Sequence, residues 1–215
     1  MPISTINQNG LTNPLTSLAS NTIQVSTGGS ASAPAISKSD DTNTGMFFPA
    51  ADTIAFTEGG TESMRINSAG QITMSSQPAF LVGRSSDVSV ATGSPIIFNN
   101  VNTLNRGNHY STSTGLFTAP VAGYYSFQVT VLISGLSNGT TAELSHAVNG
   151  SPTYNIGRYA YSAGVTGYDG LMSMASAISV YLNANDTFSI INNSTGSRTI
   201  LGSTGWSRFS GFLIG

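Results

Sequence analysis

One stretch near the middle of the chain constrains the fold most strongly. Residues 124–132 read YYSFQVTVL, in which apolar side chains alternate with Ser126, Gln128 and Thr130. A period of two is typical of a β-strand that buries one face. The segment APVAG at 119–123 precedes this stretch, and there proline fixes φ while glycine permits a positive φ. The pattern predicts a half-buried strand that begins at a sharp corner.

The composition favours β-structure over helix. Only 7% of the residues are charged, against about a quarter in an average protein. Serine, threonine, asparagine and glycine take the place of charge, whereas a helical bundle needs more alanine, glutamate, lysine and leucine. Short alternating segments separated by turn signals favour a β-sandwich over a parallel α/β sheet. The sequence therefore predicts an all-β fold.

Charge and cysteine content exclude several classes of function. The net charge of −2 gives no basic field for nucleic acid, and no stretch approaches the ~20 apolar residues of a membrane span. The absence of cysteine excludes disulfides, thiolate metal sites and cysteine nucleophiles. Residues 1–21 are polar and resemble no secretion signal. A surface-like composition without such a signal fits a virus particle released by lysis.

Several motifs of the second half resemble, in the same order, those of the C1q/TNF-like globular domain. They are GNHY at 107–110, TGLFTAP at 114–120, GYYSF at 123–127, AISVYL at 177–182, NDTFSI at 185–190 and FSGFLI at 209–214. The resemblance covers residues 77–215. It implies a jelly-roll β-sandwich that forms a trimer about a threefold axis.

The preceding block resembles a module of bacteriophage tail fibres and spikes, which lies before a C-terminal tip or chaperone domain. The resemblance rests on DTNTG at 41–45, PAADTIAF at 49–56, GG at 59–60 and RI at 65–66. We expect a turn at 40–45 and short strands at 53–56 and 63–66, joined across 58–60. The block has too few apolar residues to close a core by itself. Three copies wound about one axis would bury Phe47, Ile54, Phe56, Met64, Ile66 and Ile72 together.

These observations divide the chain into three predicted segments. Residues 77–215 would form the C1q/TNF-like jelly-roll tip, and residues 27–76 a thin intertwined trimeric β shaft. Residues 1–26 would dock on virion structural proteins, or alternatively form a flexible tail. The residues expected to dock are Ile3, Ile6, Leu11, Leu15 and Leu18, of which the last three have a weak helical spacing.

The sequence carries no recognisable catalytic motif, and we therefore predict that the protein is not an enzyme. The Gly-x-Ser-x-Gly elbow of serine hydrolases is absent. A phosphate-binding Gly-Lys pair is also absent, because the single lysine, Lys38, follows Ser37. His109 and His146 are the only histidines. We expect His109 in a turn and His146 at a polar strand position, without a metal.

The carboxylates give no stronger signal. Asp40 and Asp41 lie in a predicted turn. Asp169 and Asp186 are conceivable calcium ligands, since some C1q-like domains bind calcium. No dense loop of Asp and Asn is present to support such a site, and we predict no metal and no cofactor.

An aromatic cluster is the candidate binding site. The residues expected to bind a receptor are Tyr154, Arg158, Tyr168 and Trp206, which lie among Gly, Ser and Asn. Aromatic faces pack on sugar C–H groups, and Tyr, Ser, Gly and Asn also form adaptable protein-binding loops. Alternatively, these aromatic residues fill the core or the trimer seam. Tyr159 and Tyr161 alternate as in a strand, which favours that alternative for them.

The functional hypothesis is a homotrimeric phage fibre in the virion, whose tip adheres to a glycan or protein of the host surface without catalysis. The residues expected in the trimer core are Phe47, Phe56, Ile66, Tyr125, Phe127, Phe209 and Phe212. The alternative is a purely structural capsid, neck or baseplate fibre, or a decoration protein, whose C1q-like domain only trimerises. A depolymerase would need a carboxylate pair about 5–10 Å apart in a groove.

Overall fold

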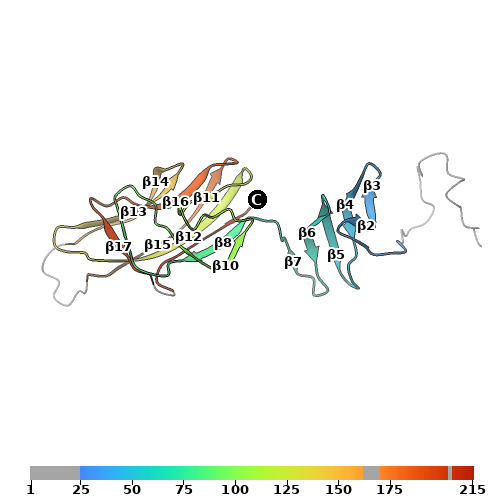
Figure 1. Ribbon diagram of the computed structural model, residues 1–215, viewed down its shortest axis with the longest axis horizontal. Helices are drawn as coiled ribbons and strands as arrows, with labels where there is room; N and C mark the ends of the chain where they lie inside the picture. The colour runs from blue at the N-terminus through green and yellow to red at the C-terminus, as the bar shows by residue number, and fades with distance from the viewer. Residues whose placement is uncertain (1–24, 162–169, 203–204) are drawn as a thin grey trace, which may run out of the picture. The chain divides into compact units, whose positions relative to one another are not determined.

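The structure is a computed structural model that describes residues 25–161, 170–202 and 205–215. Every regular element in these ranges is a β-strand, which confirms the all-β prediction. No helix in the described part of the chain is long and apolar enough to cross a membrane. The chain divides into two compact units, Met1–Thr73 and Met74–Gly215. Most strands of both units are labelled in Figure 1. The predicted docking residues, from Ile3 to Leu18, lie outside the described ranges.

The first unit contains an antiparallel meander of five strands in the order β3-β4-β5-β6-β7. Its strands are β3 (Ile36–Lys38), β4 (Asp41–Phe47), β5 (Ile54–Glu58), β6 (Thr61–Ile66) and β7 (Ile72–Thr73), and the short hairpin of β1 (Gly29–Ser30) and β2 (Ala33–Pro34) precedes them. The predicted hairpin across 58–60 is confirmed, and Gly59 and Gly60 both have positive φ. The turn predicted at 40–45 is wrong from Asp41 onward, because β4 pairs with β3 there.

One face of this meander is covered by the chain itself. Phe47, Ala55 and Thr57 are buried on that face, where Phe47 lies directly opposite Ala55. The Thr57 hydroxyl donates a 2.8 Å hydrogen bond to the Ala31 carbonyl, next to β2. The segment holding β1 and β2 therefore contacts this face. Phe47, which is predicted for the trimer core, is already covered within one chain.

The second unit consists of two antiparallel sheets. The larger sheet has the order β10-β8-β18-β12-β17-β9, with β15 also paired to β12, and the smaller has the order β11-β16-β13-β14. The strands of the larger sheet are β8 (Ala79–Gly83), β9 (Val88–Val90), β10 (Asn100–Arg106), β12 (Gly123–Ser134), β15 (Met172–Leu182), β17 (Arg198–Ile200) and β18 (Arg208–Leu213). Those of the smaller sheet are β11 (Phe117–Thr118), β13 (Thr141–Val148), β14 (Ser151–Ala160) and β16 (Thr187–Asn192). Strand β14 continues to Ala160 because it pairs along β13.

The core of the second unit is centred on β12, whose residues alternate between buried and exposed as predicted. The Phe127 ring stacks on Phe188 of the smaller sheet with 3.9 Å between ring centroids. The Tyr125 hydroxyl donates a 2.8 Å hydrogen bond to the Val121 carbonyl and fixes the corner that precedes the strand. Tyr125, Phe127 and Phe209 are each 0% exposed in a single chain. The core of one chain therefore already covers these three residues, which are predicted for the trimer core.

Candidate functional site

The outward face of β12 and its neighbours is the most distinctive surface of the second unit. Alternation directs the side chains of Tyr124, Ser126, Gln128 and Thr130 away from the core. Strand β15 pairs on one side of β12 along its length, and β18 pairs on the other side. We call this surface the outer face, defined by Tyr124, Ser126, Gln128, Thr130, Ala175, Ala177, Ser179, Tyr181, Arg208, Ser210, Phe212 and Ile214.

Large apolar side chains gather at one end of the outer face. Tyr124 lies opposite Tyr181, and their rings meet edge to face with 5.3 Å between centroids. Phe212 lies opposite Ser126 on the next strand, and the Ile214 amide donates a 2.8 Å hydrogen bond to the Tyr124 carbonyl. All four side chains are about half exposed, with Tyr124 at 56%. We call Tyr124, Tyr181, Phe212 and Ile214 the aromatic end of the outer face.

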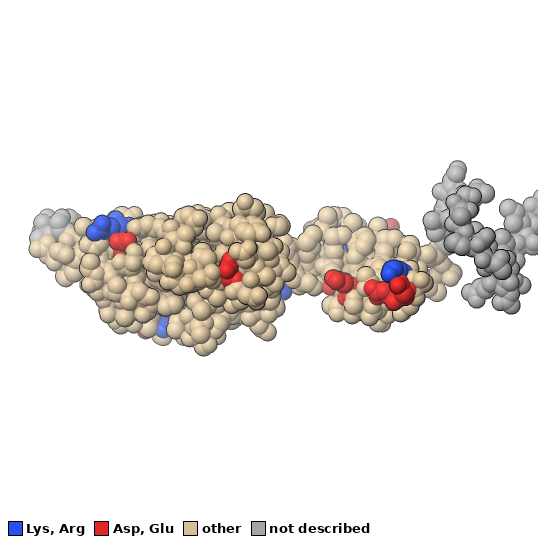
Figure 2. Space-filling view, turned by 90° about the horizontal axis from the view of Figure 1, so that it is seen from above, with Lys and Arg blue, Asp and Glu red and all other residues tan. Residues whose placement is uncertain are grey.

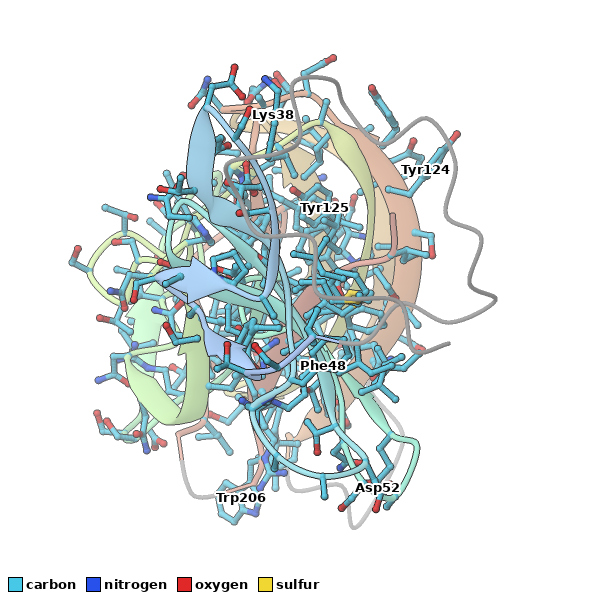
Figure 3. All side chains as sticks on the ribbon, turned by 90° about the vertical axis from the view of Figure 1, so that its right-hand side faces the viewer. Lys38, Phe48, Asp52, Tyr124, Tyr125 and Trp206 are labelled. Carbon is cyan, nitrogen blue, oxygen red and sulfur yellow. The ribbon has the colours of Figure 1, made fainter. Side chains whose placement is uncertain are left out.

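Tyr124 and Tyr125 have opposite directions although they are neighbours in sequence. Figure 3 shows the Tyr124 side chain extending away from the ribbon and the Tyr125 side chain lying within the sandwich. Tyr124 is not among the residues predicted to bind a receptor or to form the trimer core. The sequence nevertheless indicates it, because Tyr124 is an aromatic residue at an outward position of an alternating strand. Tyr181 likewise lies at an outward position, between the buried Val180 and Leu182.

The remainder of the outer face is small, polar and nearly free of charge. Small side chains such as Ala175, Ala177 and Ser179 lie beside those of β12. Among the described residues that define the outer face, only Arg208 is charged, and it lies opposite Thr130 at the end remote from Tyr124. The side of the molecule seen in Figure 2 shows similarly sparse charge. This arrangement holds no acid–base pair, and its chemistry is that of an association surface.

The predicted receptor-binding residues do not all come together. Tyr154 and Arg158 lie on β14, an edge strand, and Arg158 pairs with Glu143 at 3.3 Å. Trp206 precedes β18 of the other sheet, and Figure 3 shows it at the periphery of the view. Tyr168 lies outside the described residues.

The aromatic residues of β14 occupy the open edge of the sandwich. Tyr154 lies opposite His146, and Tyr159 lies opposite Ala142. Both partners are buried, yet Tyr154 and Tyr159 remain about half exposed. Tyr161 packs partly against the core. Tyr154 and Tyr159 therefore lie opposite buried residues while their own rings remain accessible to a ligand.

The carboxylate of Asp186 accepts hydrogen bonds from its own turn and from the turn between β13 and β14. Its Oδ1 accepts a 2.8 Å bond from the Asn149 side chain, and its Oδ2 accepts bonds from the Asn183 amide and side chain. These bonds hold the pKa of Asp186 below its ordinary value. Asp169 lies outside the described residues. In the described part of the chain, no group of three His, Cys, Asp or Glu residues is placed to hold a metal ion.

His146 is a strand residue, as predicted, but it is buried. Its side chain on β13 is 1% exposed, and neither ring nitrogen has a hydrogen-bond partner. The Phe188 ring lies 5.5 Å away between centroids. Burial lowers the pKa of His146 to about 4. The imidazole is therefore neutral at pH 7.

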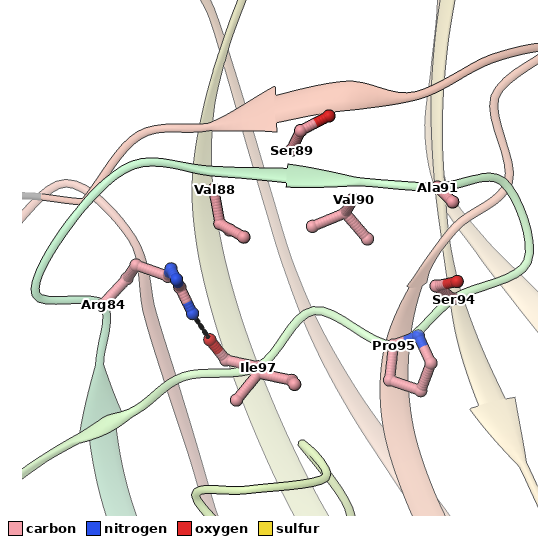
Figure 4. A pocket seen from close by; sticks show the side chains of 8 residues that line it. All are labelled: Arg84, Val88, Ser89, Val90, Ala91, Ser94, Pro95 and Ile97. Carbon is pink, nitrogen blue, oxygen red and sulfur yellow. Dashed lines mark hydrogen bonds between the residues drawn. The ribbon is translucent and has the colours of Figure 1, made fainter.

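A cavity of about 370 Å³ lies between β9 and the segment before β10, lined by Arg84, Val88, Val90, Pro95 and Ile97 among others (Figure 4). The Arg84 guanidinium donates to the Ile97 carbonyl and, at 2.9 Å, to the Ser86 carbonyl. Its donors are directed at the backbone, so Arg84 clamps two loop segments together.

The family of the second unit follows from comparison with known proteins. The family model of the C1q domain matches residues 79–214. This match covers more than half of the chain, and the chain belongs to the C1q domain family. The resemblance predicted for the second half is thereby confirmed, and the match does not extend to the residues before 79.

Solved structures of low identity are also similar to this chain. The globular domain of zebrafish complement 1qA is 20% identical, with a TM-score of 0.48 over 65% of this chain and 98% of that one. Eiger TNF from S. frugiperda is 16% identical, with a TM-score of 0.48 over 65% of this chain and 94% of that one. Murine APRIL is 14% identical, with a TM-score of 0.43 over 64% of this chain and 99% of that one. No curated protein matches the chain.

Proposed function

We propose that this chain is a non-catalytic, homotrimeric fibre protein of a bacteriophage virion, with the C1q domain as an adhesive tip. The trimer follows from the outer face, which is the observation that carries the proposal. Interface cores are depleted of charge and enriched in aromatic residues, and the outer face has both properties. The C1q/TNF-like motifs imply the same assembly. The virion and its fibre follow from the resemblance of residues 41–66 to phage fibre modules.

Introducing a charge into the outer face tests the trimer. Tyr124→Arg introduces one cation per chain at the aromatic end, and we expect it to convert the trimer to a folded monomer. Tyr154→Arg is the matched control, because it also replaces a half-exposed tyrosine on a strand of the second unit. We expect that control to remain trimeric by light scattering. Equal masses for the two variants would contradict an interface at the outer face.

The adhesive role assigns Tyr154, Arg158 and Trp206 to binding of a host-surface glycan or protein. Three weak sites on one trimer would raise the avidity by a factor on the order of 10²–10⁴ where geometry permits simultaneous engagement. The N-terminal segment, with Leu11 and Leu15, would attach the fibre to virion structural proteins. No catalytic step is part of this function.

Host-cell binding separates adhesion from a purely structural role. Labelled full-length trimer should bind host cells saturably and compete with phage adsorption. Tyr154→Ala combined with Arg158→Ala should weaken binding without changing the trimer mass, whereas Val121→Ala, at an exposed corner position, should leave binding unchanged. Absence of binding by an intact trimer would contradict the adhesive role. It would instead favour the structural capsid, neck or baseplate fibre.

A further inference from the structure

The first unit carries an apolar row that crosses four strands. Ile36 of β3 lies opposite Met46 of β4, and Met46 lies opposite Phe56 of β5. Phe56 in turn lies opposite Met64 of β6. Directly opposite residues of an antiparallel sheet direct their side chains to the same face. The four side chains therefore form one continuous strip.

A second apolar row runs beside the first. Ile54 precedes Phe56 by two positions on β5, so both lie on the same face. Ile54 lies opposite Ile66, and Ile66 lies opposite Ile72 of β7. We call the two rows together the shaft face, formed by Ile36, Met46, Ile54, Phe56, Met64, Ile66 and Ile72.

The shaft face is uncovered in a single chain. Ile72 is 61% exposed and Phe56 is 37% exposed. A shallow, open depression lies on this face, with Ile36, Lys38, Met46 and Phe56 in its lining. The opposite face of the same sheet is covered by the segment of β1 and β2, as Phe47 and Ala55 show. One face of this sheet is covered, and the other presents seven large apolar side chains. An apolar face of this kind marks a site of interaction with a partner.

Charge lies at the margin of the two rows, where Glu58 follows Phe56 by two positions on β5 and Lys38 lies beside Ile36. The ion pair of Glu62 and Arg65, at 2.6 Å, belongs to the opposite face, since Arg65 lies opposite the buried Ala55. The exposed ion pair of Lys38 and Asp40, at 2.8 Å, lies at the β3–β4 hairpin. The seven residues of the shaft face are themselves uncharged, so a charged partner would find no complementary group among them.

We propose that the shaft face is occupied by the same face of the other two copies of this chain, which rests on the trimer proposed above. Strand β7 ends at Thr73 and β8 begins at Ala79, so residues 74–78 join the units. Five residues reach at most about 18 Å. A trimer of C1q domains therefore holds three shaft faces at a local concentration in the mM range, and their apolar side chains associate. Phe56 and Ile66 belong to this seam, and Phe47 does not.

Single-cysteine labelling of the full-length chain tests this seam directly, because the natural chain has no cysteine. Ile72→Cys places the thiol in the shaft face, and Ser68→Cys places it in the exposed turn before β7. We expect a maleimide to label the first thiol roughly tenfold or more slowly than the second, because it reacts only when the seam opens. Ile36→Cys provides a second position in case the Ile72 variant does not fold.

Two further variants identify the occupant. In the Tyr124→Arg background the chain should be monomeric, and the thiol at position 72 should react as fast as the thiol at position 68. Slow labelling in that monomer, or fast labelling after removal of residues 1–24 from an intact trimer, would assign the cover to the N-terminal segment and overturn the proposal. Fast labelling in an intact trimer would overturn it as well. A chain that is monomeric without any substitution would refute the proposed function instead.

Discussion

His146 shows how one buried side chain links the fold to pH. Both ring nitrogens lack partners, and the side chains facing the ring are apolar or neutral, namely Phe188, Ile190 and Tyr154. The folded chain therefore disfavours protonation, and the pKa falls from 6.5 to about 4. The unfolded chain binds a proton first as the pH falls. Stability contributed by neutral His146 is present above pH 6.5 and is lost progressively toward pH 4.

This linkage predicts a measurable loss of stability in mild acid. Between pH 7 and pH 5, His146 should cost about 2 kcal/mol of the free energy of unfolding. His146→Leu replaces the imidazole with an apolar side chain, so that component should vanish while stability at pH 7 is kept. Denaturant titrations at equal chain concentration would measure both values. The same acid sensitivity in wild type and His146→Leu would show that another group is responsible.

Strand β12 organises the second unit because it pairs with β15, β17 and β18. Its alternation was readable from the sequence, and so was the hairpin of β5 and β6. Strand β4 was not, because the polar run from Asp41 to Gly45 has turn composition and becomes a strand through pairing with β3. Local propensity describes the run itself and does not report whether a neighbouring segment pairs with it.

At the level of this element, Phe127 should carry much of the core stability. Its ring stacks on Phe188 and also contacts Phe117 and Phe209. Phe127→Ala should lower the free energy of unfolding by about 3–5 kcal/mol, through lost burial and the cavity it leaves. Gln128→Ala, the next residue and an exposed one, should change it by less than about 0.5 kcal/mol. Similar losses in a thermal or denaturant unfolding series would contradict the assigned inward and outward faces.

For the whole molecule, the family of the second unit was predictable from the sequence, whereas the outer face was not. The C1q-like motifs identified the second unit, because they occur in order along one continuous sequence. Alternation also predicted that Tyr125, Phe127 and Phe209 are buried, but a period of two does not say whether the cover comes from the same chain or another. The structure shows that the same chain covers them. The outer face, with Tyr124 and Tyr181, emerged only from the pairing of β12 with β15.

The trimer is the central claim, and its mass is the most direct test. Light scattering of the full-length chain at micromolar concentration should give three times the 22.2 kDa chain mass, and the mass should persist on tenfold dilution. A monomer of 22.2 kDa under these conditions would contradict association through the outer face, and with it the shaft seam that depends on it.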